Sequence, residues 1–160
     1  MMKMVFKRSA LALAAMLTAT NPAFAQERAV TLTGDVLLER TVVDDSGAQT
    51  TERVAPETIV PGDRLVFTTT YVNKGGEAVT DFVVTSPLPD AVRLAPDAAD
   101  NLVVSVDSGS TFGALDTLTL ADPDGAVRPA THDDVTHIRW TLASLAAGAE
   151  GTLEYPAIIR

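Results

Sequence analysis

The stretch Arg64–Asn73 reads RLVFTTTYVN and decides the fold class of this 160-residue chain. Side chains at Leu65, Phe67 and Tyr71 alternate with a second set that begins at Val66, and a period of two places the two sets on opposite faces of a β-strand. The β-branched residues Thr and Val fit a pleated strand better than a helix. The stretch therefore predicts a strand with one face turned towards a core.

The same alternation recurs in Thr136–Leu142 and Leu153–Ile159, and turn-forming runs such as Pro61–Asp63 and Asn73–Gly76 separate the alternating segments. Strands and turns that follow each other at this pace are typical of a β-sandwich or barrel. We predict strands near Val30–Val43, Thr50–Val54, Arg64–Asn73, Thr80–Thr85, Leu102–Val106, Asp116–Leu120, Val135–Leu142 and Gly151–Ile159. The fold class predicted is all-β. Between Ala91 and Asp134 the strand order stays open, and Ala91–Asp100 has room for one helical turn.

The first residues have the pattern of a removable export signal. Basic residues lie between Lys3 and Arg8, the uncharged apolar run Ser9–Leu17 follows, and small residues occupy the first and last positions of Ala23–Ala25. The apolar run is too short to span a bilayer. We therefore predict a signal peptide at residues 1–25, a single domain at residues 26–160, and a periplasmic or secreted protein.

The composition narrows the classes of partner. The chain has 12 basic and 21 acidic residues, and removal of Lys3, Lys7 and Arg8 with the signal leaves 9 against 21, a net charge of −12. An acidic surface disfavours nucleic acid and anionic membranes as partners. There is no cysteine, which excludes disulfides, cysteine nucleophiles and thiolate metal sites. We expect no transmembrane segment in the mature chain, no cofactor, and a monomer in dilute solution.

Two further segments carry a resemblance to a known family. Val60–Pro89 contains a Pro-Gly-Asp turn, an alternating strand that ends in Asn73 followed by glycines, a second strand, and a Pro-Leu-Pro bend. Ile138–Leu153 contains a strand around Trp140 and a closing strand after a glycine turn. Both segments resemble the immunoglobulin-like conserved repeat domain of unknown function found in bacterial and archaeal cell-surface proteins.

The resemblance implies an Ig-like antiparallel β-sandwich of about seven or eight strands. It also implies a non-enzymatic role, because the family has no established activity. The expected function is an exported structural or protein-interaction module of the cell envelope or secreted fraction, with another envelope or surface protein as its partner. Trp140, the only tryptophan, belongs to the inward set of its strand and is predicted to fill the core between the sheets.

An alternative function would use an acidic loop. Asp107-Ser108-Gly109 follows an apolar strand and resembles the active-site loop of an aspartic protease, and Asp44–Gly47 contains a second Asp-Ser-Gly. That chemistry needs two carboxylates that share a proton. Asp-Ser-Gly is also a common β-turn sequence, so no catalytic residue is assigned from this motif.

A second alternative would use metal ligands. The cluster His132, Asp133, Asp134 and His137 offers two imidazoles and carboxylates, which suit Zn or Cu, and Asp122–Gly125 resembles part of a calcium loop. The structural reading of the first segment is a polar turn, and that of the second is an ordinary turn. The alternative function is thus a periplasmic metal-binding protein or hydrolase that uses the His132–His137 segment or Asp107.

The edges of an open sandwich present unpaired backbone groups to partners. Glu154 and Pro156 in the final strand add charge and remove a donor, which protects an edge. Thr68–Thr70 has no such protection and is predicted to be internal. A partner is therefore expected to bind through loops or through an edge other than the Pro156 strand.

Overall fold

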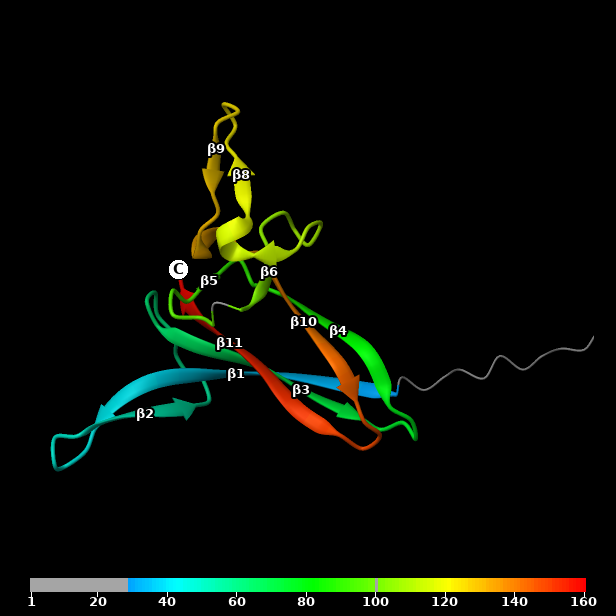
Figure 1. The fold of residues 1–160 in the computed structure, drawn as a ribbon. Helices are drawn as coiled ribbons and strands as arrows, with labels where there is room; N and C mark the ends of the chain where they lie inside the picture. Colours follow the sequence, from blue (N-terminus) through cyan, green and yellow to red (C-terminus); the bar gives the residue numbers. More distant parts are fainter. Residues whose placement is uncertain (1–28, 100) are drawn as a thin grey trace, which may run out of the picture.

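The computed structural model describes residues 29–99 and 101–160, so the predicted signal peptide lies outside the described residues. Two antiparallel sheets pack together, and a smaller hairpin projects from one end (Figure 1). The predicted all-β sandwich is confirmed. No helix in the described ranges is long and apolar enough to cross a membrane.

The larger sheet has five strands in the order β2-β1-β3-β11-β5. They are β1 (Val30–Val43), β2 (Gln49–Val54), β3 (Arg64–Asn73), β5 (Val92–Leu94) and β11 (Glu150–Ile159). β3 pairs with β1 on one side and with β11 on the other, which confirms that Thr68–Thr70 is internal. On its far side, β11 pairs with β5 only through Ala157–Ile159. The Pro156 carbonyl accepts the Ala95 N–H at 3.0 Å beside this short ladder. The outer side of β11 is therefore unpaired in the described sheet at Glu154 and before it, but not at Pro156.

The second sheet has four strands in the order β4-β10-β6-β7. They are β4 (Val79–Pro87), β6 (Val103–Ser105), β7 (Gly113–Ala114) and β10 (His137–Leu145). The projecting hairpin consists of β8 (Thr119–Ala121) and β9 (Val127–Pro129), and short 3-10 turns at Leu115–Thr117 and His132–Asp134 flank it.

The irregular segment differs from the sequence prediction. Asp116–Leu120 is not one strand, because the chain first makes a 3-10 turn at Leu115–Thr117 and pairs only from Thr119. Ala91–Asp100 begins with the three-residue strand β5 instead of a helical turn. These strands have two or three residues each, too few for an alternating pattern to be recognised in the sequence.

The core lies between the two sheets. Leu65 and Tyr155 from the larger sheet meet Ile138 and Val104 from the smaller one, and the ring of Tyr155 stacks on Phe67 with centroids 5.0 Å apart. Burial raises the pKa of the Tyr155 hydroxyl, although a hydrogen bond with Ser86 acts in the opposite direction. In each of the two strands one alternating set faces the core: the set that contains Leu65 and Phe67 in β3, and the set that contains Tyr155 and Ala157 in β11.

Trp140 faces inward but does not fill the core. Its ring lies 6.1 Å from that of Tyr155, and it packs against the core cluster while remaining only partly buried. Two residues earlier on β10, Ile138 is completely buried. The prediction of Trp140 as a central plug is therefore corrected to a place at the periphery of the core, and the aromatic residue buried in the core is Tyr155.

Asn73 connects the two sheets at one end of the sandwich. It is completely buried, and its Nδ2 donates to the carbonyls of Glu77, Leu145 and Ala146 at 2.8–3.0 Å. Its Oδ1 accepts a hydrogen bond from the backbone N–H of Gly75 at 3.0 Å. One side chain therefore satisfies backbone groups from the β3–β4 and β10–β11 connections, which would otherwise be buried without partners.

Candidate functional site

The Asp107 loop is built as a turn. The Asp107 carboxylate accepts hydrogen bonds from the Ser105 hydroxyl (2.7 Å) and from the backbone and hydroxyl of Thr111 (2.9 and 2.7 Å). These bonds, those from Thr111 first, hold the pKa of Asp107 well below its ordinary range. Ser108 and Gly109 both have positive φ, 61° and 86°. The carboxylate is therefore kept ionised as a cap for its own loop.

Asp44 has the same role at another place. Its Oδ1 accepts bonds from the Ser46 backbone (2.8 Å), the Ser46 hydroxyl (2.6 Å) and the Ala48 backbone (2.9 Å). Asp45, the aspartate of this second Asp-Ser-Gly, is its neighbour at the tip of the β1–β2 hairpin, whereas Asp107 follows β6 in a distant part of the molecule (Figure 1). The two aspartates do not meet, so the structure does not form the carboxylate pair that an aspartic protease needs.

The acidic residues of the His132–His137 segment pair with arginines and do not form a metal site with the histidines. Asp134 forms a bidentate pair with Arg128 at 2.7 and 2.8 Å, which holds the pKa of this carboxyl well below its ordinary range. The Asp133 carboxylate lies 3.7 Å from the Arg93 guanidinium and 3.5 Å from that of Arg160. Within residues 29–99 and 101–160, no three His, Asp or Glu side chains gather as ligands for a metal ion.

The two histidines face different surroundings. The His137 Nδ1 lies 3.1 Å from the Thr136 hydroxyl, and its ring packs against Gly109, where a Cβ would be 3.6 Å away. His132 lines a pocket described below. Asp122–Gly125 forms the tip of the β8–β9 hairpin, with the Gly125 N–H bonded to the Asp122 carbonyl at 2.8 Å. This geometry is that of an ordinary turn.

An unpaired length of β1 is the first feature of the structure that a partner can use. β1 pairs with β3 over Val30–Glu39 but with β2 only over Leu38–Val43. We call Val30–Leu37 the open edge, because no strand in the described part of the chain pairs with its outer side. The sequence contained a signal for it: a strand of 14 residues precedes a hairpin partner of only 6.

The direction of the backbone groups at the open edge follows from the ladder. The Asp35 carbonyl faces β3, where it accepts a bond from the Thr68 hydroxyl at 3.4 Å, and alternate residues of an antiparallel strand direct N–H and C=O to opposite sides. The backbone N–H and C=O groups that point away from β3 are therefore those of Val30, Leu32, Gly34 and Val36. The Asp35 carboxylate accepts the Val36 N–H at 2.8 Å, which protects only one end of the edge.

An apolar groove runs beside the open edge, where the start of β1 lies near β4 (Figure 1). We call it the edge groove; it encloses about 650 Å³ and is lined by Ala29, Val30, Thr31, Leu32, Val79 and Phe82. Leu32 is 46% exposed. β4 pairs with β10 and with no other described strand, so the groove separates two strands that both have free sides.

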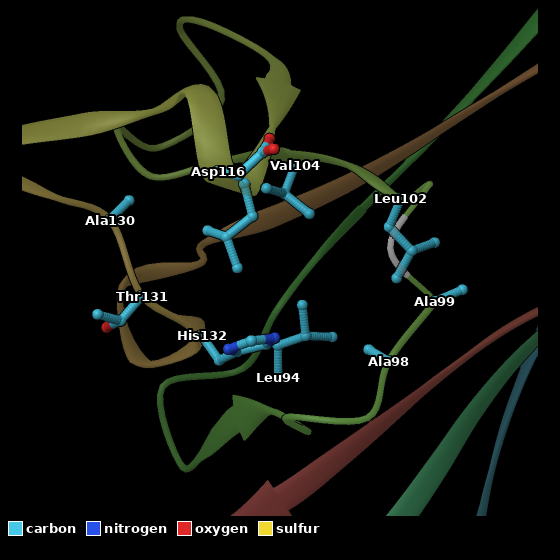
Figure 2. Close-up of a pocket in the computed structure, with 10 residues that line it drawn as sticks. Leu94, Ala98, Ala99, Leu102, Val104, Asp116, Ala130, Thr131 and His132 are labelled. Carbon is cyan, nitrogen blue, oxygen red and sulfur yellow. The ribbon is translucent and has the colours of Figure 1, made fainter.

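A second hollow lies beneath the β8–β9 hairpin (Figure 2). We call it the hairpin pocket; it encloses about 560 Å³ and is lined by Leu94, Ala98, Ala99, Leu102, Val104, Leu115, Asp116, Ala130, Thr131 and His132. Figure 2 shows His132 and Leu94 on one side of the pocket and Asp116 on the opposite side, with its carboxylate directed away from Leu94. Sequence reasoning missed this pocket because it combines three short segments whose order only the tertiary structure defines.

The residues that carry the family resemblance have structural roles. Gly62, with φ of 96°, donates to the Ile159 carbonyl at 2.9 Å, and Asp63 accepts the Val60 N–H at 2.8 Å. Asn73 is the buried link described above. Comparisons with family models, with curated proteins and with solved structures found no match to this chain.

Proposed function

We propose that this protein is an exported, non-enzymatic interaction module of the cell envelope or secreted fraction, which binds an extended segment of another envelope protein at the open edge of β1. The export-signal pattern and the resemblance to surface-protein repeat domains support the location and the class. The observation that carries the binding mode is the open edge itself, where Val30, Leu32 and Gly34 direct backbone groups outward beside an apolar groove.

Strand addition suits this geometry. Main-chain hydrogen bonds to an edge supply affinity, and a pocket that receives alternate side chains supplies specificity. The edge groove lies beside Leu32, so the added strand would place an apolar side chain there. Gly34 has no side chain to obstruct an approaching backbone.

The negative charge near the open edge favours a partner segment that is basic or neutral. Asp35 lies at one end of the open edge, Asp81 is exposed on β4, and the chain carries a net charge of −9. A second copy of this chain would bring like charges together, whereas a basic strand would be attracted. The proposed partner segment therefore alternates apolar and basic or neutral residues.

The binding mode is tested with a synthetic peptide of alternating Val and Lys, titrated into 15N-labelled mature protein. Amide resonances of Val30, Leu32 and Gly34 are expected to shift, and Leu32→Lys is expected to weaken binding at least about tenfold, the effect of losing one well-packed apolar side chain. Val83→Lys is the matched control, because Val83 is similarly exposed (49%) but lies on the outer face of β4. Equal loss in both variants, or shifts confined to β11, would refute the open edge as the site.

The export half of the proposal has its own test. Expression in a Gram-negative host is expected to yield periplasmic or secreted protein whose N-terminal residue is Gln26. Recovery of the soluble protein with an intact Met1 would contradict it without affecting the test of the edge.

A further inference from the structure

The hairpin pocket reaches the core of the sandwich. Leu94 and Val104, which line it, are 2% and 1% exposed and belong to the main core cluster, and Ala98 belongs to it as well. Leu102 and Leu115 pack against the same cluster from the sides. A ligand in this pocket would therefore replace water on an aliphatic floor, which is the common design of small-molecule sites of roughly 300–1,000 Å³.

The rim of the pocket carries an uneven distribution of charge. Asp133 and Asp134 follow His132 directly, but arginines hold both carboxylates: Arg93 and Arg160 for the first, Arg128 for the second. Asp116 lines the pocket and forms no ion pair with any other described residue. Among the described residues that line this mouth, Asp116 is therefore the one that offers a ligand a carboxylate without an arginine partner.

The two observations define a ligand by its chemistry. An aliphatic floor takes an apolar tail, and a carboxylate at the rim attracts a cationic head group that stays partly in water. A fatty acid would bring its own carboxylate beside Asp116, and like charges repel. We propose that the hairpin pocket binds small cationic amphiphiles, with the tail over Leu94 and Val104 and the ammonium group near Asp116.

This site is separate from the open edge. The hairpin pocket lies beneath β8 and β9 at one end of the molecule, whereas the edge groove lies at the beginning of β1 (Figure 1). Failure of either proposal therefore leaves the other intact.

The test uses octylammonium chloride as the probe and sodium octanoate as its charge-reversed counterpart, both titrated into 15N-labelled mature protein. Octylammonium is expected to shift the amides of Ala98, Leu115 and Thr131 and to bind more tightly than octanoate. Asp116→Asn is expected to weaken octylammonium binding by about two- to fivefold, the effect of one exposed ion pair, and to remove the preference over octanoate.

A blocking variant separates pocket binding from adsorption at the surface. Ala99 lines the pocket yet is exposed, so Ala99→Trp fills the mouth without disturbing buried residues and is expected to abolish the shifts. Ala147→Trp, at an exposed position in the β10–β11 connection, is the matched control and is expected to bind like the unmodified protein. Octanoate binding as tight as that of octylammonium, or unchanged binding to Ala99→Trp, would overturn the proposal.

Discussion

Two regions of this sandwich are stabilised in different ways. The long strands β1, β3, β4, β10 and β11 pair with one another in three ladders of eight to ten residues, so the backbone groups that face each other in these ladders are satisfied. The segment Val92–Asp134 contains strands of only two or three residues, and its loops depend on carboxylate caps at Asp107 and Asp134. A short ladder satisfies few backbone groups, and side chains must then replace it.

The largest effect is expected where both regions share one core. Ile138 is completely buried and packs in the cluster that contains Leu94 and Val104. Ile138→Ala is expected to lower the free energy of unfolding by about 2–5 kcal/mol, through lost burial and the remaining cavity. Chemical denaturation measures it, and both regions should unfold together. Separate transitions for the two regions would show that they do not share a core.

The second largest effect on stability is expected from a substitution in the region of the long strands. Asn73→Ala removes the donor to the Leu145 carbonyl and to two others, so buried acceptors lose their partner. We expect a loss of about 1–3 kcal/mol in the free energy of unfolding. Thr70→Ala, at an exposed position of the same strand, is the control and should change stability little. Equal effects of the two substitutions would mean that water replaces the Asn73 amide.

Acid should act first on the short-strand region. Hydrogen bonds from Thr111 lower the pKa of Asp107, and Arg128 lowers that of Asp134. A carboxyl whose pKa is lower in the folded state stabilises the fold above its ordinary pKa, near 4, and this contribution is lost as the pH falls further.

Native-state hydrogen exchange at pH 6 and pH 3 measures the effect as the change in opening free energy. Amides at Ser110, Thr111 and Thr131 are expected to lose more protection than those of β3 at the lower pH. A uniform loss across the molecule would indicate that the caps contribute no more than other carboxylates.

The smallest effect is expected from a substitution that changes hydrogen exchange only near the β8–β9 hairpin. Asp134→Asn keeps the shape of the side chain but removes the charge that pairs with Arg128. We expect faster exchange in Val127–Asp134 and little change in the denaturation midpoint, because the other ladders remain intact. Asp90→Asn is the control, because Asp90 lies in an exposed loop and forms no ion pair with another described residue. A large fall in the midpoint would show that this hairpin supports the whole sandwich.

The candidate sites show that a sequence motif does not by itself predict the role of its residues in the fold. Asp107 and Asp45 are the aspartates of the two Asp-Ser-Gly motifs. In the structure a carboxylate caps each turn, that of Asp107 itself in one and that of Asp44, the neighbour of Asp45, in the other. The acidic residues beside His132 are paired with arginines from β5, β9 and the chain end at Arg160. These pairings were not predictable, because the arginines are distant in sequence or lie beyond a turn of unknown direction.

The sequence by itself determined the positions of the long strands: Arg64–Asn73, which alternates with a period of two, and Val30–Val43 were both predicted with the bounds that the structure has. Alternation specifies a strand and its buried face because successive side chains point to opposite sides. It does not specify a neighbour or the extent of pairing. The open edge of β1, the hairpin pocket and the completely buried Asn73 each depend on segments far apart in sequence, so only the tertiary structure decided them.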